Sequence, residues 1–116
     1  MALDLRVRNG KSTPELRDHV ERRLGFALGR FGGRVGRVTV CLEDLNGPRG
    51  GIDQRCRIAV SLVPSGEVIA EATDLEAFAA VNRAAERIAR RVRNEFDRRL
   101  ATRKSGSTRE PDSPEA

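Results

Sequence analysis

The chain has 116 residues, 38% of them hydrophobic and 34% charged, with a formal net charge of +5. This length suits one domain with one core, and the hydrophobic content argues against a wholly disordered chain. No apolar run approaches the ~20 residues of a membrane span and the N-terminus lacks a signal-peptide segment, so we expect a cytoplasmic protein without a membrane partner.

The N-terminal segment predicts a strand followed by a helix. Residues 2–8 alternate, with Leu3, Leu5 and Val7 on one face, as in a half-buried strand. Ser12 or Thr13 can cap the following helix, and Glu15 completes a capping box if Ser12 is the cap.

The first helix is predicted to run from about Pro14 to Phe31 and to stop at Gly32 and Gly33. Its expected buried stripe consists of Leu16, Val20, Leu24, Ala27 and Phe31.

Three strands are expected next, over residues 37–43, 55–63 and 67–73. In the first two, apolar side chains alternate onto one face: Val38, Val40, Leu42, Cys56, Ile58, Val60 and Leu62. Thr73 and Glu76 then form a second capping box before a helix of about 25 residues. Its apolar stripe is Phe78, Val81, Ala85, Ile88, Val92 and Phe96.

This β-α-β-β-β-α order predicts an α+β fold with a four-stranded mixed sheet and both helices packed on one face. A parallel crossover should join the first two strands, and an antiparallel meander should follow. The other sheet face should be polar and mainly basic, with Arg6, Arg8, Arg37, Thr39, Arg55, Arg57 and Ser61. We expect one α+β domain over residues 1–101 and a disordered polar tail over 102–116.

The sequence offers little support for catalysis. His19, the only histidine, lacks a nucleophile or second ligand nearby, so a structural or surface role is favoured. Cys41 and Cys56 should lie on opposite faces of neighbouring strands, which argues against a disulfide and leaves too few ligands for zinc. We therefore expect a non-enzymatic protein with no cofactor and no metal.

Arginines concentrate on the exposed sides of both predicted helices. Arg83, Arg87 and Arg90 lie opposite the apolar stripe of the second helix, while His19, Arg23 and Arg30 share one flank of the first. A solvated charged face explains either helix alone. If the helices lie side by side, the two basic rows combine into one platform. Two helices biased the same way make nucleic acid an equal alternative.

The choice of nucleic acid follows from what the chain lacks. It has no Trp or Tyr, and its four Phe fall mostly at core-like positions, so base stacking on aromatics is disfavoured. No DNA-binding motif is present, and the arginines suit the phosphate backbone of folded RNA better than DNA.

The segment "DLNGPRGGIDQ" at residues 44–54 is longer than a hairpin requires. A tolerated insertion at a sheet edge explains it, because lengthening a loop costs only about 0.6 kcal/mol per doubling. Alternatively, its glycines let the backbone approach RNA while Arg49 meets a phosphate.

Three stretches, "STPELRDHVERRL", "RCRIAVSLVPSGEVIAEATD" and "DLEAFAAVNRAAERIARRV", resemble the ribosome hibernation-promoting factor and ribosome-associated inhibitor family, also called sigma modulation proteins. The similarity spans Leu3 to Leu100 and is most specific at residues 71–82. Phe78 departs from the Tyr that the family often has there. The long members add a C-terminal domain that pairs ribosomes, and only the short tail occupies that place here.

The resemblance implies a factor that binds the small ribosomal subunit and its rRNA in the mRNA and tRNA channel and blocks translation sterically when growth slows. We expect a monomer off the ribosome. A regulatory module whose basic face docks on an acidic protein is the alternative. Resemblance and charge pattern together predict these RNA-binding residues: Arg17, Arg22, Arg23, Arg30, Arg49, Arg83, Arg87, Arg90, Arg91 and Arg98.

Overall fold

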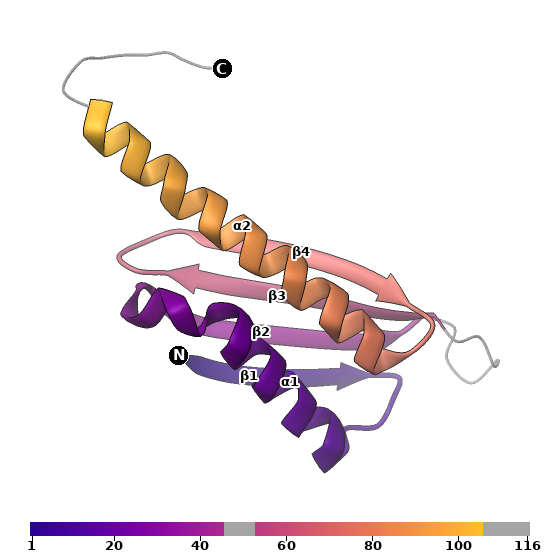
Figure 1. The fold of residues 1–116 in the computed structure, drawn as a ribbon. Helices are drawn as coiled ribbons and strands as arrows, with labels where there is room; N and C mark the ends of the chain where they lie inside the picture. Colours follow the sequence, from indigo (N-terminus) through magenta and orange to yellow (C-terminus); the bar gives the residue numbers. More distant parts are fainter. Residues whose placement is uncertain (46–52, 106–116) are drawn as a thin grey trace.

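A computed structural model describes residues 1–45 and 53–105 and shows the predicted order of elements (Figure 1). The elements are β1 (Ala2–Arg8), α1 (Pro14–Leu28), the short 3-10 helix η1 (Gly29–Arg34), β2 (Val35–Asp44), β3 (Gln54–Leu62), β4 (Glu67–Asp74) and α2 (Ala77–Ser105). The α+β class and the β-α-β-β-β-α order are therefore confirmed.

The four strands form one mixed sheet in the order β1-β2-β3-β4. β1 pairs parallel with β2, Leu5 lying opposite Val40. β2 and β3 pair antiparallel, with Val40 opposite Ile58, and β3 and β4 pair antiparallel, with Ile58 opposite Ala70. This is the predicted parallel crossover followed by an antiparallel meander, and it leaves β1 and β4 as the two edge strands.

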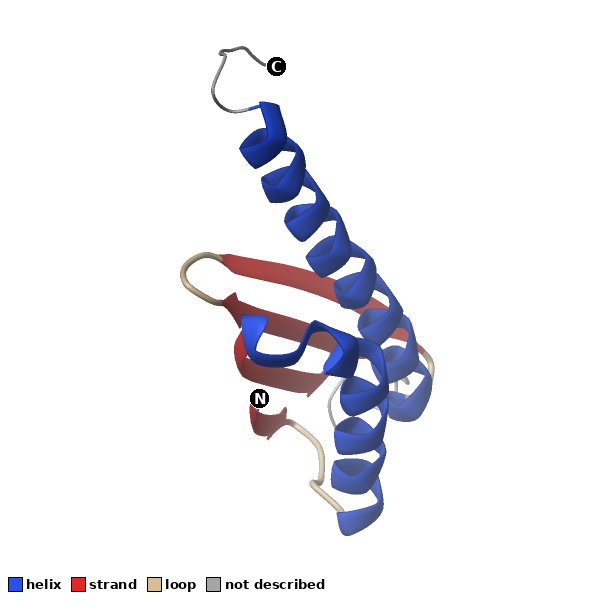
Figure 2. Cartoon of the chain, turned by 60° about the vertical axis from the view of Figure 1, so that its left-hand side comes forward, coloured by secondary structure: helices blue, strands red, loops and turns tan. Residues whose placement is uncertain are grey.

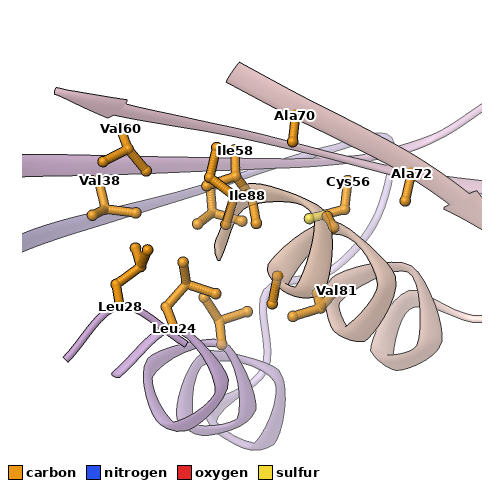
Figure 3. Packing of buried hydrophobic residues seen from close by; sticks show 14 of the residues in the cluster. Leu24, Leu28, Val38, Cys56, Ile58, Val60, Ala70, Ala72, Val81 and Ile88 are labelled. Atoms are coloured by element: carbon orange, nitrogen blue, oxygen red, sulfur yellow. The ribbon is translucent and has the colours of Figure 1, made fainter. Parts of the chain in front are cut away.

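Both helices cover the same face of the sheet, as predicted (Figures 1 and 2). The core lies between the two layers, where Leu24 and Leu28 of α1 and Val81 and Ile88 of α2 pack toward Ile58 and its neighbours (Figure 3). All five of these side chains are at most 1% exposed. Leu28 is a core residue that the predicted stripe omitted, whereas Ala27 is only partly buried.

The start and end of α1 differ in detail from the prediction. Thr13 is the N-cap, and its hydroxyl accepts a 3.1 Å hydrogen bond from the Leu16 backbone N–H. A capping box between Ser12 and Glu15 is therefore not formed. The α-helix ends at Leu28, and the chain continues as η1, in which Gly32 has a φ of 59° that glycine adopts readily.

The start of α2 also required a correction. Thr73 lies within β4, so it does not cap the helix. Asp74 is the last residue of β4, and its carboxylate accepts hydrogen bonds from the backbone N–H groups of Leu75 (2.7 Å) and Glu76 (3.4 Å) in the turn before the helix. The Ala80 N–H donates to the backbone oxygen of Glu76, so Glu76 and not Asp74 immediately precedes the helix.

α2 has 29 residues and extends well past the sheet (Figure 2). It reaches Ser105, so the first residues of the predicted tail are helical. The rest of that predicted tail lies outside the described residues, as does most of the 44–54 segment.

Candidate nucleic-acid interface

A groove of about 690 Å³ lies along the seam between α1 and α2. We call it the interhelical groove. Its lining residues come from α1, η1 and α2: Arg23, Phe26, Ala27, Arg30, Glu86, Ala89, Arg90 and Arg93. Four of these eight residues are arginines, and we refer to Arg23, Arg30, Arg90 and Arg93 as the groove arginines.

Helical periodicity and core packing bring the groove arginines together. Val20, Leu24 and Leu28 anchor α1 on the sheet, which turns the flank with Arg23 and Arg30 toward α2. On α2, Ile88 and Val92 are fully buried, so Arg90 and Arg93 emerge near the seam. This arrangement agrees with the prediction that the basic flanks of the two helices combine.

The groove arginines are not neutralised by the chain itself. Within residues 1–45 and 53–105, none of the four forms an ion pair or donates a side-chain hydrogen bond. The Nε of Arg23 is buried without a hydrogen-bond partner, and the Arg30 guanidinium lies 5.2 Å from the Phe31 ring centroid. Glu86 is the single acidic lining residue, so the groove keeps an excess of positive charge.

The other end of the seam is closed by His19. Its Nε2–H donates a 2.8 Å hydrogen bond to Asn82 Oδ1, and its ring lies 4.6 Å from the Phe78 ring. These contacts join α1 to α2, in agreement with the structural role favoured for His19. Phe78 is 41% exposed, so its predicted place in the buried stripe of α2 was wrong.

Four other predicted site arginines form ion pairs with their own neighbours. Arg17 lies 3.4 Å from Glu21 and Arg22 pairs with Asp18, both on the exposed side of α1. Arg83 lies 3.3 Å from Asp74 at the start of α2, and Arg98 pairs with Glu95. The predicted platform therefore does not form as one continuous unpaired surface.

Arg87 and Arg91, which we call the edge arginines, lie on the opposite side of α2 from the groove. The guanidinium of Arg87 donates to the backbone oxygen of Glu71 (2.7 Å), and that of Arg91 donates to the backbone oxygen of Ile69 (2.8 Å). Both acceptors belong to β4, whose outer edge has no neighbouring strand. Arg87 was expected to line up with Arg83 and Arg90, and its contact with β4 turns it away from the groove. Arg49 lies outside the described residues.

Two carboxyl groups in these pairs have perturbed acidity. Partial desolvation alone would raise the pKa of Asp74, but hydrogen bonds from Leu75, Arg83 and Glu76 lower it below its usual 3.8. The hydrogen bond from Arg99 is the main cause that lowers the pKa of Glu95. Both carboxylates therefore remain charged and keep their arginines occupied at neutral pH.

The cysteines are placed as predicted, on opposite faces of the sheet. Cys56 lies in the core, where burial raises the pKa of its thiol to about 12, and Cys41 lies on the open face. Both are free thiols. Among the described residues no group of three His, Cys, Asp or Glu side chains could hold a metal ion.

The open face of the sheet is basic in composition, as predicted, but several of its arginines form ion pairs with carboxylates. Arg6 lies 3.1 Å from Asp4, Arg55 lies 2.5 Å from Glu43, and Arg57 lies 3.9 Å from Glu71. The groove is therefore the better candidate for binding a polyanion. No helix in the described part of the chain is long and apolar enough to cross a membrane.

Five of the eight lining residues were not in the predicted site, and two of them, Arg93 and Phe26, matter most for binding a polyanion. Arg93 falls three residues after Arg90 and therefore on the same side of α2. Phe26 belongs to neither predicted apolar stripe; it falls on the α1 flank that carries Arg23 and Arg30 and is 82% exposed. Helical spacing could have found both.

Comparison with known proteins points to one family of ribosome-associated proteins. Residues 3–100 match the family model described as sigma 54 modulation protein / S30EA ribosomal protein. No curated protein matches the sequence significantly.

Two solved structures share the fold. The N-terminal domain of Protein Y from Thermus thermophilus is 28% identical, with a TM-score of 0.67 over 81% of this chain and 98% of that one. A ribosomal subunit interface protein from Coxiella burnetii is 13% identical, with a TM-score of 0.68 over 84% and 99% of the two chains.

Proposed function

Because the chain belongs to the sigma 54 modulation protein / S30EA ribosomal protein family, we propose that it is a ribosome hibernation factor. In this proposal it binds the rRNA of the small ribosomal subunit in the mRNA and tRNA channel and inhibits translation by occupying that space. The similarity to a Protein Y domain and the unpaired charge of the interhelical groove support the proposal.

The groove arginines are the observation that carries this proposal. A guanidinium without an intrachain acceptor can bind a phosphate without first breaking an ion pair. Each exposed contact of this kind should contribute roughly 1 kcal/mol, and several together should give an affinity that falls steeply with salt as counterions are released.

The proposed mechanism requires no catalytic group. A rigid domain that fills the channel excludes mRNA and tRNA as long as it stays bound, and only binding free energy determines its occupancy. α2 gives the domain an elongated shape, since it extends well past the sheet (Figure 1).

Sedimentation of the full-length protein with purified small subunits through sucrose gradients, at low and high salt, tests the proposal. We expect cosedimentation at low salt and release at high salt. Exchanging one groove arginine on each side of the seam, Arg30→Glu with Arg90→Glu, should weaken binding by about 100-fold or more, because each reversal replaces an attraction with a repulsion.

The matched control is Arg17→Glu with Arg22→Glu, which changes the net charge equally at arginines that already pair with carboxylates. This control should lose less than a tenth as much affinity as the groove variant. Equal losses would show that only total charge matters, and binding that survives the groove exchange would overturn the proposal.

The family description also names sigma 54 modulation, so a regulatory module that docks on an acidic protein is the second candidate. It predicts that the protein stays at the top of the gradient in cell extract at low salt, away from subunits and ribosomes.

A further inference from the structure

We propose that the interhelical groove takes an unpaired nucleotide, whose base stacks on Phe26 while its phosphates contact the groove arginines. This inference rests on the proposed function and specifies which form of RNA the site binds. It also departs from the expectation that base stacking on aromatic side chains is disfavoured.

Phe26 occupies an unusual place for a large apolar side chain. Its side chain is 82% exposed, and it lines the groove together with Arg23 and Arg30. A single exposed phenylalanine is not unusual in a protein surface. A flat ring among four unpaired guanidinium groups, however, matches the combination of stacking surface and cationic groove by which proteins hold single-stranded nucleic acid.

The other phenylalanine rings are already engaged within the chain. The Phe31 and Phe96 rings lie 5.6 Å apart, and the Arg34 guanidinium lies 4.4 Å from the Phe96 centroid. Phe78 packs against His19. In the described part of the chain, no ring or guanidinium stacks on Phe26, so its faces are available to a base.

The groove distinguishes an unpaired base from a duplex. Its volume of about 690 Å³ falls within the range of roughly 300–1,000 Å³ that is typical of sites for small ligands, which suits one nucleotide. In an A-form duplex the base faces are hidden by stacking, so a helix would offer Phe26 only sugar and phosphate. An unpaired nucleotide offers the ring a base face and the arginines a phosphate at the same time.

Glu86 is consistent with a base in the groove. Its carboxylate repels phosphate, but it can accept a hydrogen bond from the exocyclic amino group of adenine, cytosine or guanine. The groove therefore contains acceptors and donors of the kinds that a nucleotide needs, in addition to its positive charge.

A short oligoribonucleotide with one central 2-aminopurine tests the proposal, used single-stranded and annealed to its complement. Binding of the full-length protein should quench the single-stranded probe by stacking, with weaker binding of the duplex. Phe26→Leu, which keeps an apolar side chain but removes the ring, should weaken single-strand binding by at least about fivefold. The slope of log affinity against log salt should stay unchanged, because no charge is removed.

Phe26→Trp is the rescue variant and should bind at least as tightly as the wild type, because it restores a stacking surface. An unquenched probe, or equal affinity of Phe26→Leu and wild type for the single strand, would overturn the inference. Thermal melting of each variant confirms the fold, which an exposed side chain should not affect.

The same variants separate this inference from the proposed function. If Phe26→Leu cosediments with small subunits as well as the wild type and the probe is not quenched, the stacking site is refuted and the ribosomal function stands. If the wild type fails to cosediment at low salt, the proposed function is refuted, whatever the probe shows.

Discussion

The groove arginines and the edge arginines of α2 are close in sequence but differ in what they contact. Arg90 lines the groove and has no acceptor among residues 1–45 and 53–105, whereas Arg91, the next residue, donates to the Ile69 backbone oxygen of β4. One residue corresponds to a turn of about 100° around a helix, which is enough to move a guanidinium from the seam to the sheet edge. An exposed arginine in this domain can therefore either remain available to bind a partner or form a contact that stabilises the fold.

The edge contacts have a clear physical benefit. β4 is an edge strand, and its outward carbonyl groups would otherwise be free to pair with another chain. Arg87 and Arg91 occupy two of these carbonyls, at Glu71 and Ile69.

Replacing both edge arginines tests whether they stabilise the fold while the groove arginines do not, and it should have the largest effect on stability. Arg87→Gln with Arg91→Gln should lower the free energy of unfolding by about 1 to 2 kcal/mol, because two charge-assisted hydrogen bonds at exposed sites are lost. Arg90→Gln with Arg93→Gln should change it by less than about 0.5 kcal/mol, as expected for surface residues without partners. Urea unfolding of both double variants measures the difference.

Binding of the same variants to small subunits should show the reverse order, with the greater loss for Arg90→Gln and Arg93→Gln. If the edge variant loses more affinity while its stability stays unchanged, the edge arginines contact RNA and the division between the two sets is wrong.

The sequence predicted the fold well because the fold depends on local periodicity. Alternation placed Val38, Val40 and Ile58 on one face, and three- and four-residue steps placed Leu24 and Ile88 on theirs; all five are fully buried. Errors occurred where two local signals compete. The spacing of Thr73 and Glu76 resembles a capping box, but β4 continues through Asp74 and α2 begins only at Ala77.

The site was predicted only in part, since its residues are defined by contacts between elements. Arg23, Arg30 and Arg90 were expected to combine, and the structure brings them together along one groove. Asp74, Glu95 and the β4 carbonyls determine which arginines already have an acceptor within the chain. The position of β4 beside α2 is a tertiary feature. Spacing along one helix does not contain that information.

The N-cap of α1 provides a stability test for the helix that carries Arg23, one of the groove arginines, and that does not contribute to the β4 edge. Thr13→Ala removes the acceptor for the Leu16 N–H and should cost about 1 kcal/mol of stability. Ser12→Ala is the matched control and should have almost no effect, since the Ser12 hydroxyl does not cap the helix in the structure. Thermal or urea unfolding measures both. A larger loss for Ser12→Ala would mean that the capping box forms in solution.

The smallest expected effect on stability concerns the ion pair between Asp74 and Arg83, an arginine that is already bound to a carboxylate of the same chain. The pKa of Asp74 is lowered in the folded state, so its contribution to stability is complete above its usual pKa of 3.8 and is lost as the pH falls through the folded value. Asp74→Asn should remove this part of the acid sensitivity. Urea unfolding of both proteins at a series of pH values measures it as a narrowing difference between the two stability curves below about pH 4.

Arg83→Gln separates the two kinds of contact that lower the pKa of Asp74. The backbone N–H groups of Leu75 and Glu76 still donate to Asp74 without the Arg83 guanidinium, so this variant should keep part of the acid-dependent loss that Asp74→Asn abolishes. Glu95 titrates in all three proteins and cancels from the differences between them. Parallel curves for the wild type and Asp74→Asn would show that the carboxylate does not depend on these donors, and Arg83 would then be as available to a phosphate as Arg90.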